Sequence, residues 1–290
     1  MKEAVRLAIG GPPSIGARAA AVLTELMASS GVQSARTGSV VLEWPNAALP
    51  FDAAAWSASA PTSADPLAAA FARLHAPAGD GWDAPVDAVR ATVADWLRAE
   101  RLRLTPPWPD GATCAIALVH DAQPLPSRPG RLRGVLRRER TTGLEPYAAI
   151  AAVERDHRAV SALRSIDLLD PAEQTRTRAL GFALDTPAGV HIAGLPGFRR
   201  GTAFPTRGYD RAAERADDHV ELPLLGDDPA AWLGPLLDGG GGAALAIPVG
   251  RFAGDDAEGA IAAYDDLLGR LRSRGAWLTT PAALVRALYA

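Results

Sequence analysis

The sequence predicts an α/β protein, and two observations support that class. Residues 114–119 form an unbroken apolar run between a Pro-Asp-Gly turn and the prolines Pro124 and Pro126, which is typical of a buried strand in a parallel sheet. From residue 112 to the end, candidate strands alternate with segments of helical periodicity. This order favours a barrel-like parallel sheet built around residues 114–119.

Composition narrows the functional classes. The 290 residues are 48% hydrophobic and 22% charged, as in ordinary globular proteins, and 30 basic residues face 33 acidic ones. That balance argues against nucleic-acid partners and against an anionic membrane surface. Cys114, the single cysteine, has no internal disulfide partner. The N-terminus lacks a signal-peptide pattern and no 18-residue apolar run occurs, so we expect a soluble, cytoplasmic protein.

The first 104 residues predict an N-terminal α/β extension. Expected strands are 5–9 and 40–44, and expected helices are 14–27, 65–75 and 85–98, with 53–64 as a loop. The last helix carries an apolar stripe at helical spacing, made of Val86, Val89, Val93, Trp96 and Leu97. We expect this stripe to cover an open side of the barrel domain, residues 105–290.

The barrel domain begins with the strand 114–119, and a basic loop, 124–140, follows it. That loop either binds an acidic sugar or phosphate group or is a solvated charged face. The remaining expected strands are 160–163, 181–186, 219–224, 243–248 and 275–278. The expected helices are 145–158, 171–180, 227–238 and 257–272, with a closing helix from residue 280.

Polar side chains stand where the central strand ends. His120 and Asp121 follow the apolar run directly, at the carboxyl end of the strand, where α/β folds place their chemistry; the alternative is that they only terminate the strand. The order WPDG (108–111), apolar strand, HD resembles the first motif of the polysaccharide deacetylase (NodB-homology) family, WP-x-G…LTHDVD. Further segments that resemble this family are 154–165, 196–205 and 275–284.

The resemblance implies a distorted (β/α) barrel with one divalent metal, usually zinc. It places Asp121 as the general base, with His120 beside it, and Arg199 as the residue that orients Asp121 through a hydrogen-bonded pair. It also marks four positions as substrate-binding candidates, namely Trp108, Asp185, Arg200 and Thr202.

The chain departs from the family at the metal. Gln123 stands where the motif has a ligand Asp, and a neutral amide is a poor ligand for a hard cation. The sequence contains no H-x-x-x-H pair, and 247–250 reads Ile-Pro-Val-Gly where the family has its general-acid histidine. No metal site and no cofactor are therefore predicted. The alternative is a rebuilt zinc site made of His120, Asp121 and one of His157, His191 and His219, though no pair of these histidines has metal-ligand spacing on one element.

These observations predict a shortened deacetylase-like barrel that has lost its metal. The leading interpretation is a pseudoenzyme that binds a carbohydrate or a partner protein in polysaccharide metabolism. One alternative is an active carbohydrate N- or O-deacetylase with a rebuilt site. A second alternative is an oligomer subunit whose partner covers exposed sheet edges.

Overall fold

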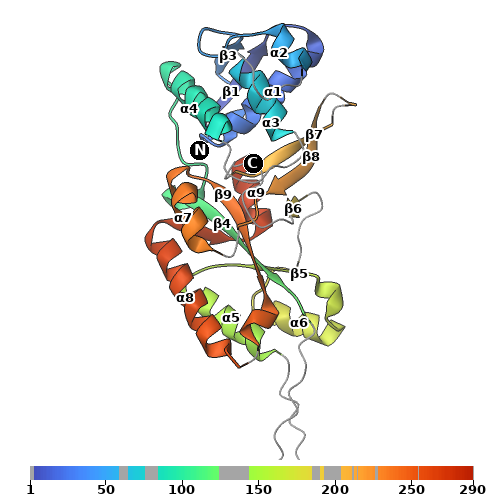
Figure 1. The fold of residues 1–290 in the computed structure, drawn as a ribbon, viewed down its shortest axis with the longest axis vertical. Helices are drawn as coiled ribbons and strands as arrows, with labels where there is room; N and C mark the ends of the chain where they lie inside the picture. Colours follow the sequence, from blue (N-terminus) through green and yellow to red (C-terminus); the bar gives the residue numbers. More distant parts are fainter. Residues whose placement is uncertain are drawn as a thin grey trace, which may run out of the picture.

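The computed structural model shows a mixed α/β protein with parallel sheets, which confirms the predicted class. The N-terminal region lies at one end of an elongated molecule and the central sheet lies below it (Figure 1). The residues that the structure describes are 3–58, 65–75, 84–123, 144–184, 190–192, 204–210, 212–213, 215–225, 228–253 and 255–289. The basic loop 124–140 and the predicted site residues Asp185, Arg199, Arg200 and Thr202 lie outside this set.

The N-terminal sheet has three parallel strands in the order β2-β1-β3: β1 (Glu3–Ile9), β2 (Val32–Ser34) and β3 (Val40–Trp44). Helix α1 (Pro13–Ala28) links β1 to β2. Residues 35–39 then carry the chain across β1 so closely that a Cβ on Gly38 would lie 2.4 Å from the carbonyl carbon of Val5. Only glycine permits this short crossing.

Three helices complete the N-terminal region: α2 (Ala53–Ala58), α3 (Pro66–Leu74) and α4 (Ala84–Ala99). Asp65 caps α3 by accepting from the backbone N–H groups of Leu67 and Ala68, and it also accepts from Trp56 Nε1 at 2.8 Å. The cap therefore ties α2 to α3, where the sequence predicts a loop.

The apolar stripe of α4 packs inside the N-terminal region. Its five residues are buried in one core with apolar side chains of α1, α3, β1 and β3. The expectation that the stripe covers an open side of the second sheet is therefore wrong. The nearest apolar surface along the chain is the face of the β2-β1-β3 sheet and its helices, and α4 packs there because burial against it needs no long connection.

The central sheet is built around β4 (Cys114–Asp121), whose partners are all parallel. β9 (Gly242–Pro248) lies along almost its whole length on one side. Two short strands share the other side of β4: β10 (Ala276–Thr279) pairs with the first half of β4, and β5 (Ala162–Arg164) pairs with its second half. Single bridges add Ala183 next to β5 and Leu224 next to β9. The described strands thus form an open parallel order with β4 in the middle.

The two faces of β4 contact different helices. Ile116 and Leu118 lie in the largest core, with α5 (Glu145–Asp156) and α8 (Ala257–Ser273). Ala115 and Ala117 lie in a second core with α9 (Pro281–Tyr289). All residues from 114 to 120 are fully buried, as expected for a central parallel strand.

A third sheet has the order β6-β8-β7: β6 (Val190–Ile192), β7 (Thr206–Asp210) and β8 (Arg215–Leu222). β8 pairs parallel with β6 and antiparallel with β7, and continues toward the bridge that joins Leu224 to β9. Helices α6 (Pro171–Ala179) and α7 (Pro229–Asp238) complete the described helices. None of these helices combines the length and apolar character that a membrane crossing requires.

Candidate functional site

The candidate site lies at the carboxyl end of β4, where register and side-chain alternation separate His120 from Asp121. In the register, His120 is opposite Leu163 of β5 and Ile247 of β9, and Asp121 is opposite Arg164 and Pro248. Successive strand residues point to opposite faces of a sheet. His120 therefore joins the core formed with α5 and α8, and Asp121 turns to the other face.

His120 is fully buried and both of its ring nitrogens have partners. Nε2 lies 2.8 Å from Glu154 Oε1, and Nδ1 lies 3.3 Å from the carbonyl oxygen of Ile247. Phe182, Phe252 and Tyr264 pack edge-on around the imidazole. Each ring nitrogen of His120 therefore has an oxygen atom of Glu154 or Ile247 within hydrogen-bonding distance.

Glu154, on α5, is the centre of this buried network. Besides the contact with His120, it accepts from the Ser161 hydroxyl at 2.7 Å and from the Tyr264 hydroxyl at 2.8 Å. Burial, and then the charge of Glu154, raise the pKa of Tyr264 well above its ordinary value, so this phenol keeps its proton and donates. A buried polar cluster with all partners present is stabilising, whereas a partly satisfied one is not. This network therefore fixes α5, α8 and the end of β4 together.

Asp121 forms an ion pair with Arg164 across neighbouring strands. Arg164 Nη2 donates to Asp121 Oδ2 at 3.0 Å, and Arg164 Nε donates to the other carboxylate oxygen. This hydrogen bonding raises the pKa of the Arg164 guanidinium above its ordinary value. The two side chains keep 25% and 35% of their surface exposed, so the pair lies at the rim of the sheet and solvent screens it in part.

Gln123 completes this rim. A Cβ placed on Gly250 would lie only 2.3 Å from the side-chain oxygen of Gln123. The Gln123 amide therefore packs against the backbone just after β9. The Tyr147 hydroxyl lies 3.3 Å from both the backbone N and O of Gln123, which fixes the chain at this point. The Gln123 side chain itself is exposed. The rim thus offers an amide, a carboxylate and a guanidinium to solvent.

The residues at this end of β4 do not fit the zinc that the family resemblance implies. Both oxygens of Asp121 face the cationic Arg164, both nitrogens of His120 are used inside the core, and Gln123 is a neutral amide. Within the described ranges, no three His, Cys, Asp or Glu side chains gather as metal ligands would.

The other predicted site residues fall in different places. Trp108 is only 3% exposed; its indole donates to the Gly240 carbonyl at 2.7 Å and stacks on Phe204, and the Arg90 guanidinium also lies over the Phe204 ring. It is thus an interior anchor between α4 and the sheets.

His157 pairs with Asp265 at 2.7 Å, away from β4. Nothing is described of the side chains of His191 and His219, nor of Asp185, Arg199, Arg200 and Thr202.

Cys114 has no role at the candidate site. It begins β4 inside the core with no exposed surface, and burial raises the pKa of its thiol to about 11. A protonated, buried thiol is a poor nucleophile.

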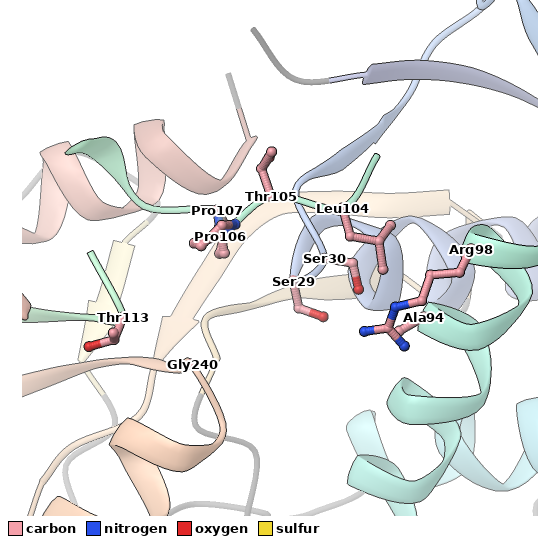
Figure 2. Close-up of a pocket in the computed structure, with 10 residues that line it drawn as sticks. All are labelled: Ser29, Ser30, Ala94, Arg98, Leu104, Thr105, Pro106, Pro107, Thr113 and Gly240. Carbon is pink, nitrogen blue, oxygen red and sulfur yellow. The ribbon is translucent and has the colours of Figure 1, made fainter. Parts of the chain in front are cut away.

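A separate pocket of about 330 Å³ lies at the opposite, amino end of β4 (Figure 2). The end of α1, the second half of α4 and the linker 104–107 surround it, and the Arg98 guanidinium extends from α4 toward Ser29 and Ser30. Three of its polar side chains have partners outside it: Arg98 contacts Asp95 at 2.5 Å, Ser29 donates to the Leu26 carbonyl, and Thr113 donates to the Arg274 carbonyl. The pocket is therefore a gap between packed regions, remote from His120 and Asp121.

Sequence reasoning missed the residues that hold His120 and Asp121, which are Glu154, Ser161, Tyr264 and Arg164. Three of them lie in 154–165, a segment whose resemblance to the deacetylase family was recognised without a role for any side chain. Tyr264 carried no signal, because its contact with β4 spans more than a hundred residues of sequence.

Comparison of the chain with protein-family models, curated proteins and solved structures finds no match. The deacetylase resemblance therefore rests on the motifs alone.

Proposed function

We propose that this protein is a polysaccharide-deacetylase-like carbohydrate-binding protein without metal-dependent hydrolysis, and that its central sheet is a shortened, distorted form of the (β/α) barrel. The observation that carries the proposal is the Asp121–Arg164 pair. Both oxygens of this aspartate are directed at a guanidinium held in register rather than at a metal or a water.

The rim of the sheet has the chemistry of a sugar site. Carbohydrate hydroxyls and acetamido groups are recognised by planar polar side chains that donate and accept at fixed angles. Gln123 is exposed, and Asp121 and Arg164 keep a quarter to a third of their surface in solvent. Beneath them, the buried His120–Glu154 network gives the rim a rigid base.

The test uses the purified full chain with an N-acetylated disaccharide as the probe. Calorimetry is expected to show binding of the disaccharide, elemental analysis to show no stoichiometric zinc, and an acetate assay to show no product. Arg164→Ala is expected to weaken binding about tenfold or more. Arg36→Ala, at an exposed arginine of the N-terminal region, is the matched control and should leave binding unchanged.

Two results would overturn the proposal. About one tightly held zinc per chain, together with acetate release that Asp121→Asn abolishes, would establish an active deacetylase. Disaccharide binding that Arg164→Ala and Arg36→Ala leave equally intact would place the ligand elsewhere.

A further inference from the structure

A partly buried carboxyl group joins the N-terminal region to the C-terminal end of the chain, away from the candidate site. Glu25 lies on α1, and Tyr289 is the last residue of α9. The Tyr289 hydroxyl is 2.5 Å from Glu25 Oε2 and 3.0 Å from the carbonyl oxygen of Pro205. The backbone N–H of Arg207, at the start of β7, also donates to Glu25 Oε2, at 3.3 Å. Figure 1 shows the end of α9 beside β7 and below α1.

Counting protons at this junction constrains the state of Glu25. The Tyr289 hydroxyl has one proton, and both of its neighbours, the Glu25 oxygen and the Pro205 carbonyl, are acceptors when Glu25 is ionised. One of the two short O···O contacts would then lack a proton. If Glu25 is a carboxylic acid, it donates to the phenol oxygen and the phenol donates to Pro205, so both contacts become hydrogen bonds.

The surroundings act in the same direction. Desolvation by the surrounding protein is the largest influence and raises the pKa of Glu25, against smaller lowering effects of the Tyr289 hydrogen bond and of Arg207. The pKa of Tyr289 is raised well above its ordinary value by burial and by the charge of Glu25, so the phenol does not lose the proton instead.

Other charged groups stand on the elements packed around Glu25. The Arg207 guanidinium lies over the Tyr289 ring at 4.1 Å, which leaves it stacked on the ring rather than bonded to the carboxyl group. Glu221 of β8 is opposite Thr206 in the register, and Arg286 lies one turn before Tyr289 on α9. Of these groups, the charge of Arg207 favours the ionised form of Glu25, but less strongly than desolvation opposes it.

We propose that Glu25 is protonated in the folded protein at neutral pH, and that the relay Glu25–Tyr289–Pro205 is a pH-sensitive latch between α1 and the C-terminal part of the chain. Ionisation of Glu25 places a carboxylate in a partly buried junction and breaks one link of the relay, so the junction loosens as pH rises. The latch is independent of the proposed carbohydrate site.

The sign of the pH effect follows from the raised pKa. A carboxyl group whose pKa is higher in the folded state than in the unfolded chain stabilises the fold fully below the unfolded value, near 4.5. That stabilisation declines as pH rises and is lost once pH passes the folded-state pKa. Over that interval one proton leaves on unfolding, so the unfolding constant rises about tenfold per pH unit.

The experiment compares urea unfolding of the full-length wild type and Glu25→Gln from pH 4.5 upward. Glutamine is neutral, has the same shape and can donate to Tyr289. The ratio of the wild-type to the variant unfolding constant is expected to rise with pH by up to tenfold per unit and then level off. Glu100→Gln, at an exposed glutamate, is the matched control and should leave the pH profile of the wild type unchanged. Parallel profiles for wild type and Glu25→Gln would overturn the latch.

A direct measurement keeps the proposal testable if Glu25→Gln does not fold. The carboxyl carbon of Glu25 is followed by NMR in wild type labelled with ¹³C-glutamate, and its signal is assigned by its shift in Tyr289→Phe. A signal in the protonated position at pH 7 supports the latch. A signal in the ionised position at pH 7 refutes it.

Discussion

Replacing Glu154 by alanine is the most severe single change that the structure offers. The carboxylate accepts from three buried groups, His120 at 2.8 Å, Ser161 at 2.7 Å and Tyr264 at 2.8 Å, and no other acceptor in the described network could take its place. Glu154→Ala leaves these three donors without a partner and opens a cavity between α5 and β4. We expect the folded state to lose much of its stability.

The magnitude follows from the contacts. A hydrogen bond to a charged group contributes about 1.5–3 kcal/mol, so three contacts give a gross total of roughly 5–9 kcal/mol. Burying the carboxylate and the imidazole opposes this by several kcal/mol, and removing one partner of a buried pair costs about 3–5 kcal/mol net. We expect a loss of about 4 kcal/mol, which is a large part of the roughly 5–15 kcal/mol that stabilises a folded protein.

Urea unfolding followed by circular dichroism measures this loss, and hydrogen exchange locates it. Glu145→Ala is the matched control, because Glu145 lies exposed in the first turn of the same helix. There we expect a loss of only about 0.3–1 kcal/mol from the helix dipole. Exchange should accelerate in β4 and α5 for Glu154→Ala and stay unchanged in β4 for the control.

A loss for Glu154→Ala as small as that of the control would refute the reasoning, since it would mean that the three donors are satisfied without Glu154. If Glu154→Ala does not fold, Tyr264→Phe serves instead. It keeps the ring in place and removes one donor, and should lose about 1.5–3 kcal/mol.

Two further predictions concern the ends of the central strands. The Cys114 thiol, buried and with its pKa raised to about 11, should not react with a thiol reagent in the native protein at pH 8 and should react fully in urea; native reactivity would contradict its burial. A Cβ at Gly242 would lie 2.6 Å from the Trp108 ring, so Gly242→Ala should destabilise by about 1–3 kcal/mol in urea unfolding. Gly269 lies inside α8, and a Cβ there would be 3.5 Å from its nearest neighbour, His157 Cε1, so Gly269→Ala should instead stabilise by about 0.5–1 kcal/mol. Similar effects at the two glycines would disprove the close contact with Trp108.

The sequence predicts the apolar elements of this fold well. The run 114–119 is the buried central strand, and helices near 14–27, 65–75, 85–98 and 257–272 all form within a few residues of the predicted bounds. These elements are governed by burial of a continuous run or of one helical face, which the sequence displays directly.

Elements whose stability comes from distant contacts are not predicted. β7 and the first half of β8, which carries Arg215, Asp217 and Asp218, become strands because they pair with each other, whereas the second half of β8 lies in the predicted strand 219–224. Helix α2 is a short Ala-rich segment that is anchored by the bond from Trp56 to Asp65. Neither the β7–β8 pairing nor the Trp56–Asp65 hydrogen bond can be inferred from local secondary-structure propensity.

The candidate site shows the same division. The end of β4 identifies His120 and Asp121, but the choice of their partners depends on register. Arg164 is 43 residues from Asp121 in the chain and becomes its neighbour only because β5 pairs with the second half of β4. A shift of that pairing by one residue would send Arg164 to the opposite face.

The buried network therefore contributes more to the arrangement of the sheet than to its chemistry. His120 contacts Ile247 of β9 and Glu154 of α5. Glu154 in turn contacts Ser161, just before β5, and Tyr264 of α8. An apolar core of the same volume could match its stability, because burying charges is costly. Directional bonds, however, add to the penalty on a slipped strand, since a one-residue slip of β5 would take Ser161 away from Glu154 and a slip of β9 would take the Ile247 carbonyl away from His120. That register also sets Arg164 opposite Asp121, so the network beneath the rim determines which groups the rim exposes to solvent.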